Sequence, residues 1–154
     1  ILLNIRKMMD TEKIEYQHVS HKPVQPSEQA AEIRGDPLSI GGKALVVKIG
    51  DGFRLFALSA ALRLNSAAVR KRFASRWLRY ASVSELLDPP GLGPGSVPPF
   101  GKPILRLSLC IDSSLLTNER IAFNAGSLTD SLIMQTADYL TVAKGEIFRF
   151  SEER

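Results

Sequence analysis

The chain has 154 residues, of which 44% are hydrophobic and 23% charged, so it is long enough for one domain with a hydrophobic core and too short for two ordinary ones. A net charge of +4 permits a polyanionic partner without requiring one, and the single cysteine excludes an internal disulfide and favours a reducing compartment. No apolar run approaches the roughly 18 residues of a membrane span, and the opening residues lack a signal peptide's apolar core, so we expect a cytoplasmic protein without membrane association.

The first forty residues predict a helix, a strand and a second helix. Residues 1–13 are typical of an amphipathic helix, and residues 14–19 could form a first strand. The stretch PSEQAAEIRGDP is typical of a short helix that begins at residues 26–27. Gly35 is a natural left-handed stop for this helix, and Pro37 prevents its continuation.

A hairpin and two helices are expected next. Residues 43–49 and 53–59 are the predicted strands of the hairpin, joined by the turn Asp51-Gly52. The stretch NSAAVRKRFAS predicts a helix capped by Asn65 or Ser66. The stretch SVSELL begins another helix, with Ser and Glu three residues apart in capping-box spacing.

The second half of the chain predicts a loop followed by alternating strands and a helix. Residues 88–101 hold five prolines and four glycines and cannot form a helix or a central strand. Leucines and an isoleucine alternate with polar residues over 104–111, which predicts a half-buried strand. The remaining expected elements are strands at 120–124, 131–135 and 146–150 and a helix at TADYLTVA. Helices and strands are interspersed without strict alternation, so we expect an α+β domain around a mixed sheet.

Few residues have the spacing of a known catalytic or metal site. His18 and His21 are three apart near a strand end, which puts them on opposite faces and makes them a poor metal pair, so we expect surface or capping histidines. Cys110 lies near the end of an alternating strand and is expected to be a packed small side chain.

A basic run follows the hairpin and has two open interpretations. Val69 and Phe73 are four apart and would face the core together, so the basic residues project outward. They form either a solvated helix face or a contact with nucleic-acid phosphates. The basic residues are Arg70, Lys71, Arg72, Arg76 and Arg79.

The stretch GPGSVPPFG is a stiff loop that could approach a ligand. Gly95 and Gly101 allow close approach or a sharp turn, and Pro98 and Pro99 hold the segment between them rigid. Such a loop can present backbone N–H groups to an anion or a carbonyl oxygen. A surface loop made rigid for stability remains the alternative.

Several stretches, taken in order, resemble the YbaK/ProX family of aminoacyl-tRNA deacylases, which also occur as an editing domain associated with prolyl-tRNA synthetases. They are PVQPSEQAAEIRG, GGKALVVK, ALSAALRLN, GSVPPFG, SSLL, IAFNAG and SLIM, and the resemblance as a whole runs from about His18 to Phe150. The resemblance implies one α+β editing domain over residues 1–154, with a mixed sheet, flanking helices and a cleft. It also implies hydrolysis of the ester that joins a wrong amino acid to the 3′ adenosine of tRNA, without a metal or a cofactor.

The resemblance places the functional lysine of the family on Lys43, where the ammonium could hold a phosphate, ribose or carbonyl oxygen and where the neighbouring glycines would let the acceptor end come close. The residues that it assigns to substrate binding are His21, Pro26, Gly42, Gly95, Ser96, Val97, Pro98, Gly101, Asn124, Ala125, Gly126 and Ser131. We further expect Arg70, Lys71, Arg72 and Arg76 to contact tRNA.

The chain departs from the family pattern at several of these positions, which bear on the amino acid specificity. Ser96 stands where a second glycine is common, and Asn124 and Ser131 replace a serine and an aspartate of the YbaK branch. Val19 replaces a tyrosine of that branch, and Pro26 occupies a position that is often threonine in the synthetase-like branch.

The resulting expectation is a freestanding trans-editing deacylase that acts on alanine or cysteine esters of tRNA-Pro. Its partners would be the acceptor end of tRNA and, as the resemblance allows, a prolyl-tRNA synthetase. Hydrolysis would need no strong general base, because the ester is already activated and the ribose hydroxyl of the substrate can assist a bound water. The alternative is a non-catalytic module of the same fold that binds tRNA or a synthetase. Lys43 and the loop favour the enzyme, whereas Val19 and Ser131 favour the module.

Overall fold

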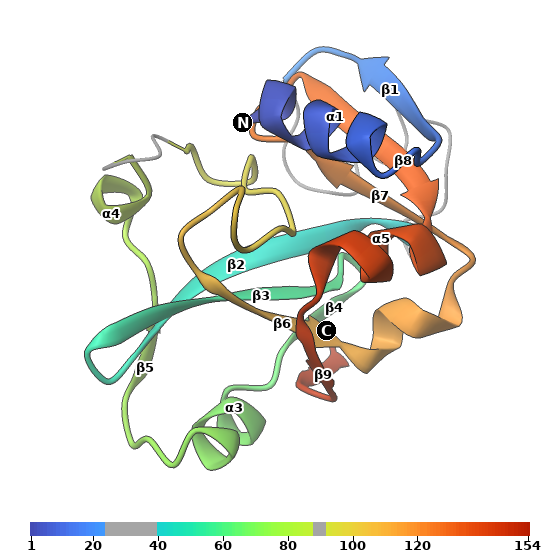
Figure 1. Ribbon diagram of the computed structural model, residues 1–154. Helices are drawn as coiled ribbons and strands as arrows, with labels where there is room; N and C mark the ends of the chain where they lie inside the picture. Colours follow the sequence, from blue (N-terminus) through green and yellow to red (C-terminus); the bar gives the residue numbers. More distant parts are fainter. Residues whose placement is uncertain (24–39, 88–91) are drawn as a thin grey trace.

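A five-stranded mixed sheet forms the centre of the computed structural model, which describes residues 1–23, 40–87 and 92–154 (Figure 1). In spatial order its strands are β5 (Leu78–Tyr80), β2 (Gly42–Ile49), β3 (Gly52–Ser59), β6 (Ser108–Asp112) and β9 (Glu146–Phe148). Strand β2 is antiparallel to both of its neighbours, whereas β3, β6 and β9 run parallel. The predicted α+β fold around a mixed sheet is therefore confirmed.

The hairpin of β2 and β3 is present, but its turn lies one residue earlier than predicted. Ile49 pairs with Gly52, so the two turn residues are Gly50 and Asp51. Gly50 has φ of +60°, in the left-handed region that a two-residue hairpin turn requires and that glycine adopts without strain. The glycine before Asp51, rather than the one after it, therefore makes the turn.

The strand predicted at 104–111 is wrong in its first half, because β6 begins only at Ser108. The N–H of Leu105 donates to the carbonyl of Gly101 at 3.0 Å, so the chain is turning where a strand was expected. The leucines still alternate in burial, with Leu105 and Leu109 in the core. A turning segment that buries every second or fourth residue shows the same alternation of apolar and polar residues as a half-buried strand, and this is why the prediction was wrong.

A separate three-stranded antiparallel sheet stands at one end of β2 (Figure 1). Its strands, in spatial order, are β1 (Tyr16–Ser20), β8 (Asp130–Gln135) and β7 (Arg120–Asn124). The strand predicted at 120–124 is confirmed, and the other two are confirmed with their starts shifted by one or two residues. A single parallel bridge between Gly41 and Ala122 joins this sheet to the start of β2.

The amphipathic first helix and the helix after the hairpin are both present. The first, α1 (Leu2–Thr11), lies over the three-stranded sheet in Figure 1 and buries Ile5 and Met9. In α3 (Ser66–Arg72), the side chain of Asn65 accepts a hydrogen bond from the N–H of Ala68 at 3.1 Å, so Asn65 is the cap.

Helix α4 (Val83–Leu87) begins with the predicted capping box. The N–H of Ser82 donates to Glu85 at 2.8 Å, and the N–H of Glu85 donates to the Ser82 hydroxyl at 3.2 Å. Helix α5 (Thr136–Ala143) coincides with TADYLTVA and leads from β8 toward β9. The helix predicted from residues 26–27 to Gly35 lies outside the described residues.

Three short strands escaped the sequence analysis. One is β5 of the central sheet. The other two are β4 (Leu62–Leu64) and β10 (Ser151–Glu153), which pair with each other. Their position depends on Asp112, a fully buried carboxylate at the end of β6. It accepts hydrogen bonds from the N–H of Phe150 and the hydroxyl of Ser151, both at 2.6 Å. It also caps the 3₁₀ helix η2 (Ser113–Thr117).

The central sheet separates two hydrophobic clusters, because successive residues of a strand face opposite sides. On β6, Leu109 and Ile111 pack into the first cluster and Cys110 into the second. The first cluster also holds the buried faces of α1 and α5 and the loop that precedes β6. The second cluster lies between the sheet and α3, with Phe150 at its centre.

Candidate functional site

Gly41 and Gly42 bring the start of β2 against β7. Gly41 is bridged to Ala122, and a Cβ on Gly42 would stand 2.8 Å from the side chain of Ile121. The space beside Gly42 is therefore filled by the protein itself. This corrects the expectation that both glycines make room for a ligand, since Gly42 is buried and allows two strands to approach each other.

The bridge also sets the position of Lys43 relative to the end of β7. Two residues beyond Gly41 and Ala122 stand Lys43 and Asn124, which lie on the same sides of their strands as the bridged residues. Lys43 is half-buried at the entry of β2, where it pairs with Leu58 of β3. The register thus directs a lysine and an amide toward the same end of the central sheet.

A chain of hydrogen bonds runs from the end of β1 to the glycine–proline loop. Nε2 of His21 lies 2.8 Å from the hydroxyl of Ser131, which donates to Oδ1 of Asn124 at 3.0 Å. Nδ2 of Asn124 then donates to the carbonyl oxygen of Gly95 at 2.8 Å. Three strands and the loop are held in one arrangement by these side chains.

The loop from Gly95 to Gly101 is held by its carbonyl groups. The carbonyl of Ser96 accepts from the N–H of Gly126 at 2.9 Å, and the carbonyl of Pro99 accepts from the hydroxyl of Tyr139 at 2.6 Å. Gly95 has φ of +84°, so a side chain there would be strained. The loop is consequently rigid before any ligand arrives.

Gly101 is restricted for a different reason from Gly95. A Cβ at this position would stand 2.6 Å from the carbonyl oxygen of Leu107 and 3.1 Å from Cβ of Leu109. We expected a side chain here to meet a ligand or to oppose a positive φ. The structure shows instead a buried glycine packed against its own chain.

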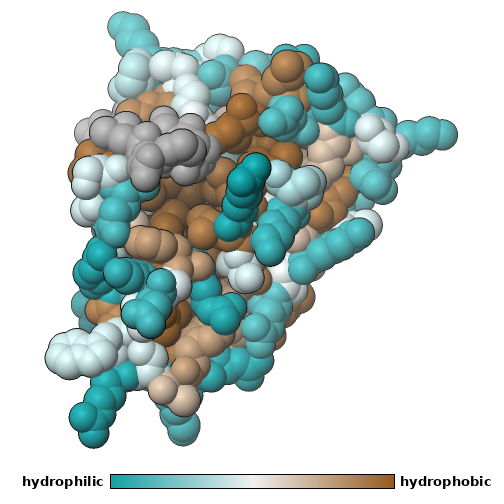
Figure 2. Space-filling model, turned by 60° about the vertical axis from the view of Figure 1, so that its left-hand side comes forward, coloured by the Kyte–Doolittle hydropathy of each residue, from teal (hydrophilic) through white to brown (hydrophobic). Residues whose placement is uncertain are grey.

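The residues assigned to substrate binding fall into two groups by accessibility. Lys43, His21, Asn124 and Gly126 are half-buried, and Gly95 is exposed. The buried residues, which can contribute only by shaping the site or through the backbone, are Gly42, Ser96, Val97, Pro98, Gly101, Ala125 and Ser131. Pro26 lies outside the described residues. Figure 2 shows that the side of the molecule at the left of Figure 1 has a hollow in which hydrophobic side chains gather.

Tyr139 is the residue of this site that the sequence analysis missed. Its hydroxyl is fully buried, and burial raises its pKa above the ordinary range. Its ring packs edge to face against Phe100, with centroids 5.4 Å apart. The helical pattern of TADYL was recognised, but nothing in it pointed to a loop forty residues earlier in the chain.

Other titratable groups serve structure. Nε2 of His18 lies 2.8 Å from Asp130, and this hydrogen bond lowers the pKa of the carboxyl group. Burial raises the pKa of Cys110 to about 11, so its thiol stays protonated and unreactive at neutral pH. Within residues 1–23, 40–87 and 92–154, no group of histidine, cysteine and acidic side chains could hold a metal ion.

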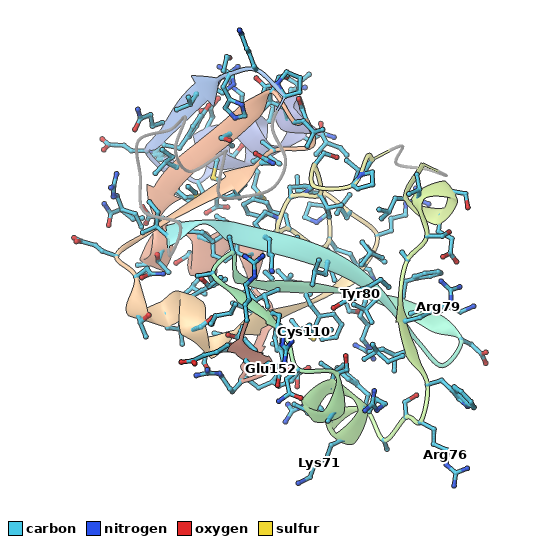
Figure 3. All side chains as sticks on the ribbon, turned by 180° about the vertical axis from the view of Figure 1, so that it is seen from behind. Lys71, Arg76, Arg79, Tyr80, Cys110 and Glu152 are labelled. Carbon is cyan, nitrogen blue, oxygen red and sulfur yellow. The ribbon has the colours of Figure 1, made fainter. Side chains whose placement is uncertain are left out.

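Some residues of the basic run form ion pairs within the protein, and others do not. Arg72 pairs with Glu146 and stacks on the Phe148 ring, and Arg79 makes two hydrogen bonds with Glu85. Within the described part of the chain, no ion pair holds Arg70, Lys71 or Arg76. Lys71 and Arg76 point away from the body of the protein in Figure 3.

The fold and the site together define an α+β domain in which a lysine, a chain of side-chain hydrogen bonds and a rigid backbone loop lie where two sheets meet. The same fold occurs in solved structures, at sequence identities that bear on the fold alone. A crystal structure of a hypothetical protein has a TM-score of 0.85 at 20% identity, covering 96% of this chain and 99% of the other. A candidate trans-editing enzyme for prolyl-tRNA synthetase has a TM-score of 0.82 at 19% identity, covering 98% and 96%.

Sequence similarity identifies the family. The model of the aminoacyl-tRNA editing domain matches residues 21–142, so this chain belongs to that family. It is 34% identical over 149 residues to the multifunctional Ser/Thr-tRNA deacylase ProXp-y of Escherichia coli K12, covering 93% of this chain and 88% of the relative. The protein of the same description from Escherichia coli O157:H7 matches equally well. The resemblance stated from the sequence is confirmed.

Proposed function

We propose that this chain hydrolyses the ester that joins a small amino acid to the 3′ adenosine of a tRNA, and that serine and threonine esters are its substrates. The observation that carries the proposal is the chain of hydrogen bonds from His21 through Ser131 and Asn124 to Gly95. It fixes a polar wall and a backbone loop near the start of β2, in a domain of the aminoacyl-tRNA editing family. The acceptor end of tRNA is the partner that this function requires.

Lys43 and the loop supply the two kinds of contact that an ester hydrolase needs. An ammonium group at the mouth of β2 binds a phosphate, ribose or carbonyl oxygen of the acceptor end. The backbone N–H of Gly95, on the exposed turn, polarises the ester carbonyl without reorganising, because the Asn124 amide and the Gly126 N–H already hold the carbonyl groups of the loop. A water then attacks the carbonyl carbon, and the 3′ oxygen leaves with a proton.

Asn124 is the group best placed to recognise a substrate hydroxyl. Its amide uses one N–H for the carbonyl of Gly95 and one lone pair for the hydroxyl of Ser131. An amide has a second N–H and a second lone pair, which suit the donor and acceptor of a serine or threonine side chain. The relative ProXp-y is named as a Ser/Thr-tRNA deacylase, which supports the same choice.

The decisive experiment is a panel of tRNAs charged with serine, threonine, alanine, cysteine and proline, in which loss of the ester is followed with time. We expect the serine and threonine esters to be cleaved fastest. Selective cleavage of alanine or cysteine esters of tRNA-Pro, as expected from the sequence alone, would overturn the assignment of the amino acid. No cleavage of any ester would favour the non-catalytic module, with tRNA or a prolyl-tRNA synthetase as its partner.

Lys43 is tested with a control on the same strand. Lys43→Ala should lower the rate tenfold to a hundredfold, because a lost charge-assisted contact costs about 1.5–3 kcal/mol if it acts in the transition state. Lys48→Ala removes the same charge from the other end of β2, where the ammonium lies 5.8 Å from the Phe53 ring, and should have little effect. Equal rates in the two folded variants would remove Lys43 from the mechanism.

The Asn124 assignment has its own measurement, the ratio of the serine and alanine rates. Asn124→Ala should lower this ratio at least tenfold, because the hydroxyl loses its partner. Asn4→Ala removes an exposed amide from α1 and serves as the control. An unchanged ratio in a folded Asn124→Ala protein would show that the hydroxyl is recognised elsewhere.

A further inference from the structure

The segment from α3 to β5 presents positive charge that the described chain does not neutralise. Residues 70–80 contain five basic residues and no acidic one. Ion pairs occupy Arg72 and Arg79. Arg70, Lys71 and Arg76 make none of the ion pairs of the described residues, so their charge is available to a polyanion.

The same segment exposes two large aromatic side chains. Trp77 is 78% exposed and Tyr80 is 53% exposed, although burial of either ring in a core would contribute to stability. Trp77 stands just before the edge strand β5, and its backbone is fixed on both sides, because Ser75 Oγ donates to its carbonyl at 2.9 Å and accepts from its N–H at 3.3 Å. An exposed indole on a fixed backbone between two arginines is an arrangement suited to stacking.

We propose that Trp77, with Tyr80 and the cations Lys71 and Arg76, binds the unpaired nucleotides that precede the terminal adenosine of the tRNA substrate. Aromatic rings stack on bases of any sequence, and neighbouring cations contact the phosphates. This inference rests on the proposed function, because it takes tRNA as the substrate and Lys43 as the site of the terminal adenosine. It gives Trp77 and Tyr80 a role in substrate binding that does not follow from membership of the family.

The position of the patch fits this part of the substrate. Arg79 of β5 pairs with Lys48, which is five residues from Lys43 along β2. Tyr80 pairs with Val47 and Leu78 with Ile49, so at about 3.4 Å per residue Tyr80 lies roughly 14 Å from Lys43, and Trp77, one residue before Leu78, roughly 24 Å. A few extended nucleotides span these distances, so the terminal adenosine could reach Lys43 while the preceding bases stack on β5.

The composition of the patch favours RNA over a protein or a membrane partner. Tryptophan, tyrosine and arginine are enriched at protein interfaces as well, but the buried centres of those interfaces are depleted of lysine and of charged residues in general. Here each aromatic side chain is next to a basic residue in the sequence, Arg76 beside Trp77 and Arg79 beside Tyr80. An amphipathic membrane helix would need an apolar face, and α3 turns its apolar residue Val69 into the second cluster.

Trp77 is the only tryptophan of the chain, so its fluorescence reports directly on the patch. The wild-type protein is titrated with three RNAs: an uncharged tRNA, the same tRNA without its unpaired 3′ nucleotides, and a short single strand ending in CCA. We expect saturable quenching by the first and third RNAs and no quenching by the truncated tRNA. Binding of the complete tRNA without a change in fluorescence would overturn the proposal.

Variants then separate stacking from charge. Trp77→Ala should weaken binding of the complete tRNA about fivefold to a hundredfold, measured by electrophoretic mobility, and raise KM for the charged tRNA more than it lowers kcat. Arg76→Ala should lower the slope of log affinity against log salt by about 0.7. Controls are Val83→Ala, which trims another exposed apolar side chain, and Lys7→Ala, which removes a charge from α1.

The outcomes distinguish this proposal from the proposed function. If a Trp77→Ala protein binds tRNA with wild-type affinity and cleaves esters at the wild-type rate, the proposed role of the patch is wrong and the proposed deacylase function still holds. Quenching by tRNA in a protein that cleaves no ester would support the patch and reject the deacylase. Quenching by a prolyl-tRNA synthetase or by anionic vesicles, with none by RNA, would assign the patch to a different partner and overturn the proposal.

Discussion

Gly101→Ala is the substitution that most directly connects packing to the proposed activity. The new Cβ would stand 2.6 Å from the carbonyl oxygen of Leu107, whereas ordinary contact begins at 3.4 Å. The two segments must therefore separate by about 0.8 Å. Both belong to backbone rather than to the flexible end of a side chain, so the loop itself has to move.

The expected magnitude follows from this displacement. Overpacking of a close-packed site costs about 1–3 kcal/mol, which lowers Tm by roughly 2–12 °C in a chain of this length. A misplacement near 1 Å can cost about a hundredfold in rate. We therefore expect turnover of the charged tRNA to fall tenfold to a hundredfold in protein that is still folded at the assay temperature.

Two other glycines supply matched controls for thermal melting and single-turnover ester cleavage. Gly93→Ala lies in the same loop, where a Cβ meets nothing within 4 Å, and should behave as wild type. Gly145→Ala brings a Cβ to 2.8 Å from the Ile111 side chain, away from the loop, and should lower Tm with little loss of turnover. A Gly101→Ala protein with wild-type turnover, or one that loses no more turnover than Gly145→Ala at equal loss of Tm, would refute the argument.

Three further predictions concern single hydrogen-bonded groups. Tyr139→Phe should cost about 1–3 kcal/mol of unfolding free energy and lower turnover, because the carbonyl of Pro99 loses its buried donor; denaturant unfolding and ester cleavage measure the two effects, and an unchanged stability would show that the bond is dispensable. Asp112→Ala should cost about 3–5 kcal/mol and speed hydrogen exchange over residues 150–153, because buried donors are left unpaired; slow exchange there would contradict this. The hydrogen bond from Arg79, followed by the N–H of Ser82, lowers the pKa of Glu85 from 4.5 to about 2. This contribution to stability is complete above pH 4.5 and is lost as the pH falls through about 2, so carboxyl NMR should show Glu85 ionised at pH 3.5 and Arg79→Ala should raise its pKa.

The polar wall of the site also explains two departures from the family pattern. The resemblance places Ser131 where the YbaK branch has an aspartate, and Ser131 is fully buried between His21 and Asn124. A hydroxyl has one proton and two lone pairs and can bond to a neighbour as donor or as acceptor, whereas an ionised carboxylate could only accept. The departures at Ser131 and Asn124 are thus matched to each other, and they are compatible with an active hydrolase.

The sequence by itself determined the local elements and the family. Helix caps at Asn65 and Ser82, the hairpin, and the helix TADYLTVA depend on contacts between residues a few positions apart, which side-chain chemistry and periodicity specify directly. The ordered motifs also indicated the editing domain, because residue types and their order along the chain can be compared with a family pattern without knowing the structure. The assignment of Lys43 and of the loop from Gly95 to Gly101 to the site also comes from these motifs.

Only the tertiary structure decided which of the expected site residues can face a ligand. Gly42 and Gly101 had the pattern of ligand-approach glycines, yet their open sides are filled by Ile121 and by the carbonyl of Leu107. The contact of Tyr139 with Pro99 and the strand pairing of β4 with β10 join residues that are far apart in sequence. Such contacts depend on how whole elements pack, and side-chain periodicity carries no information on which distant segment will occupy the other side of a residue.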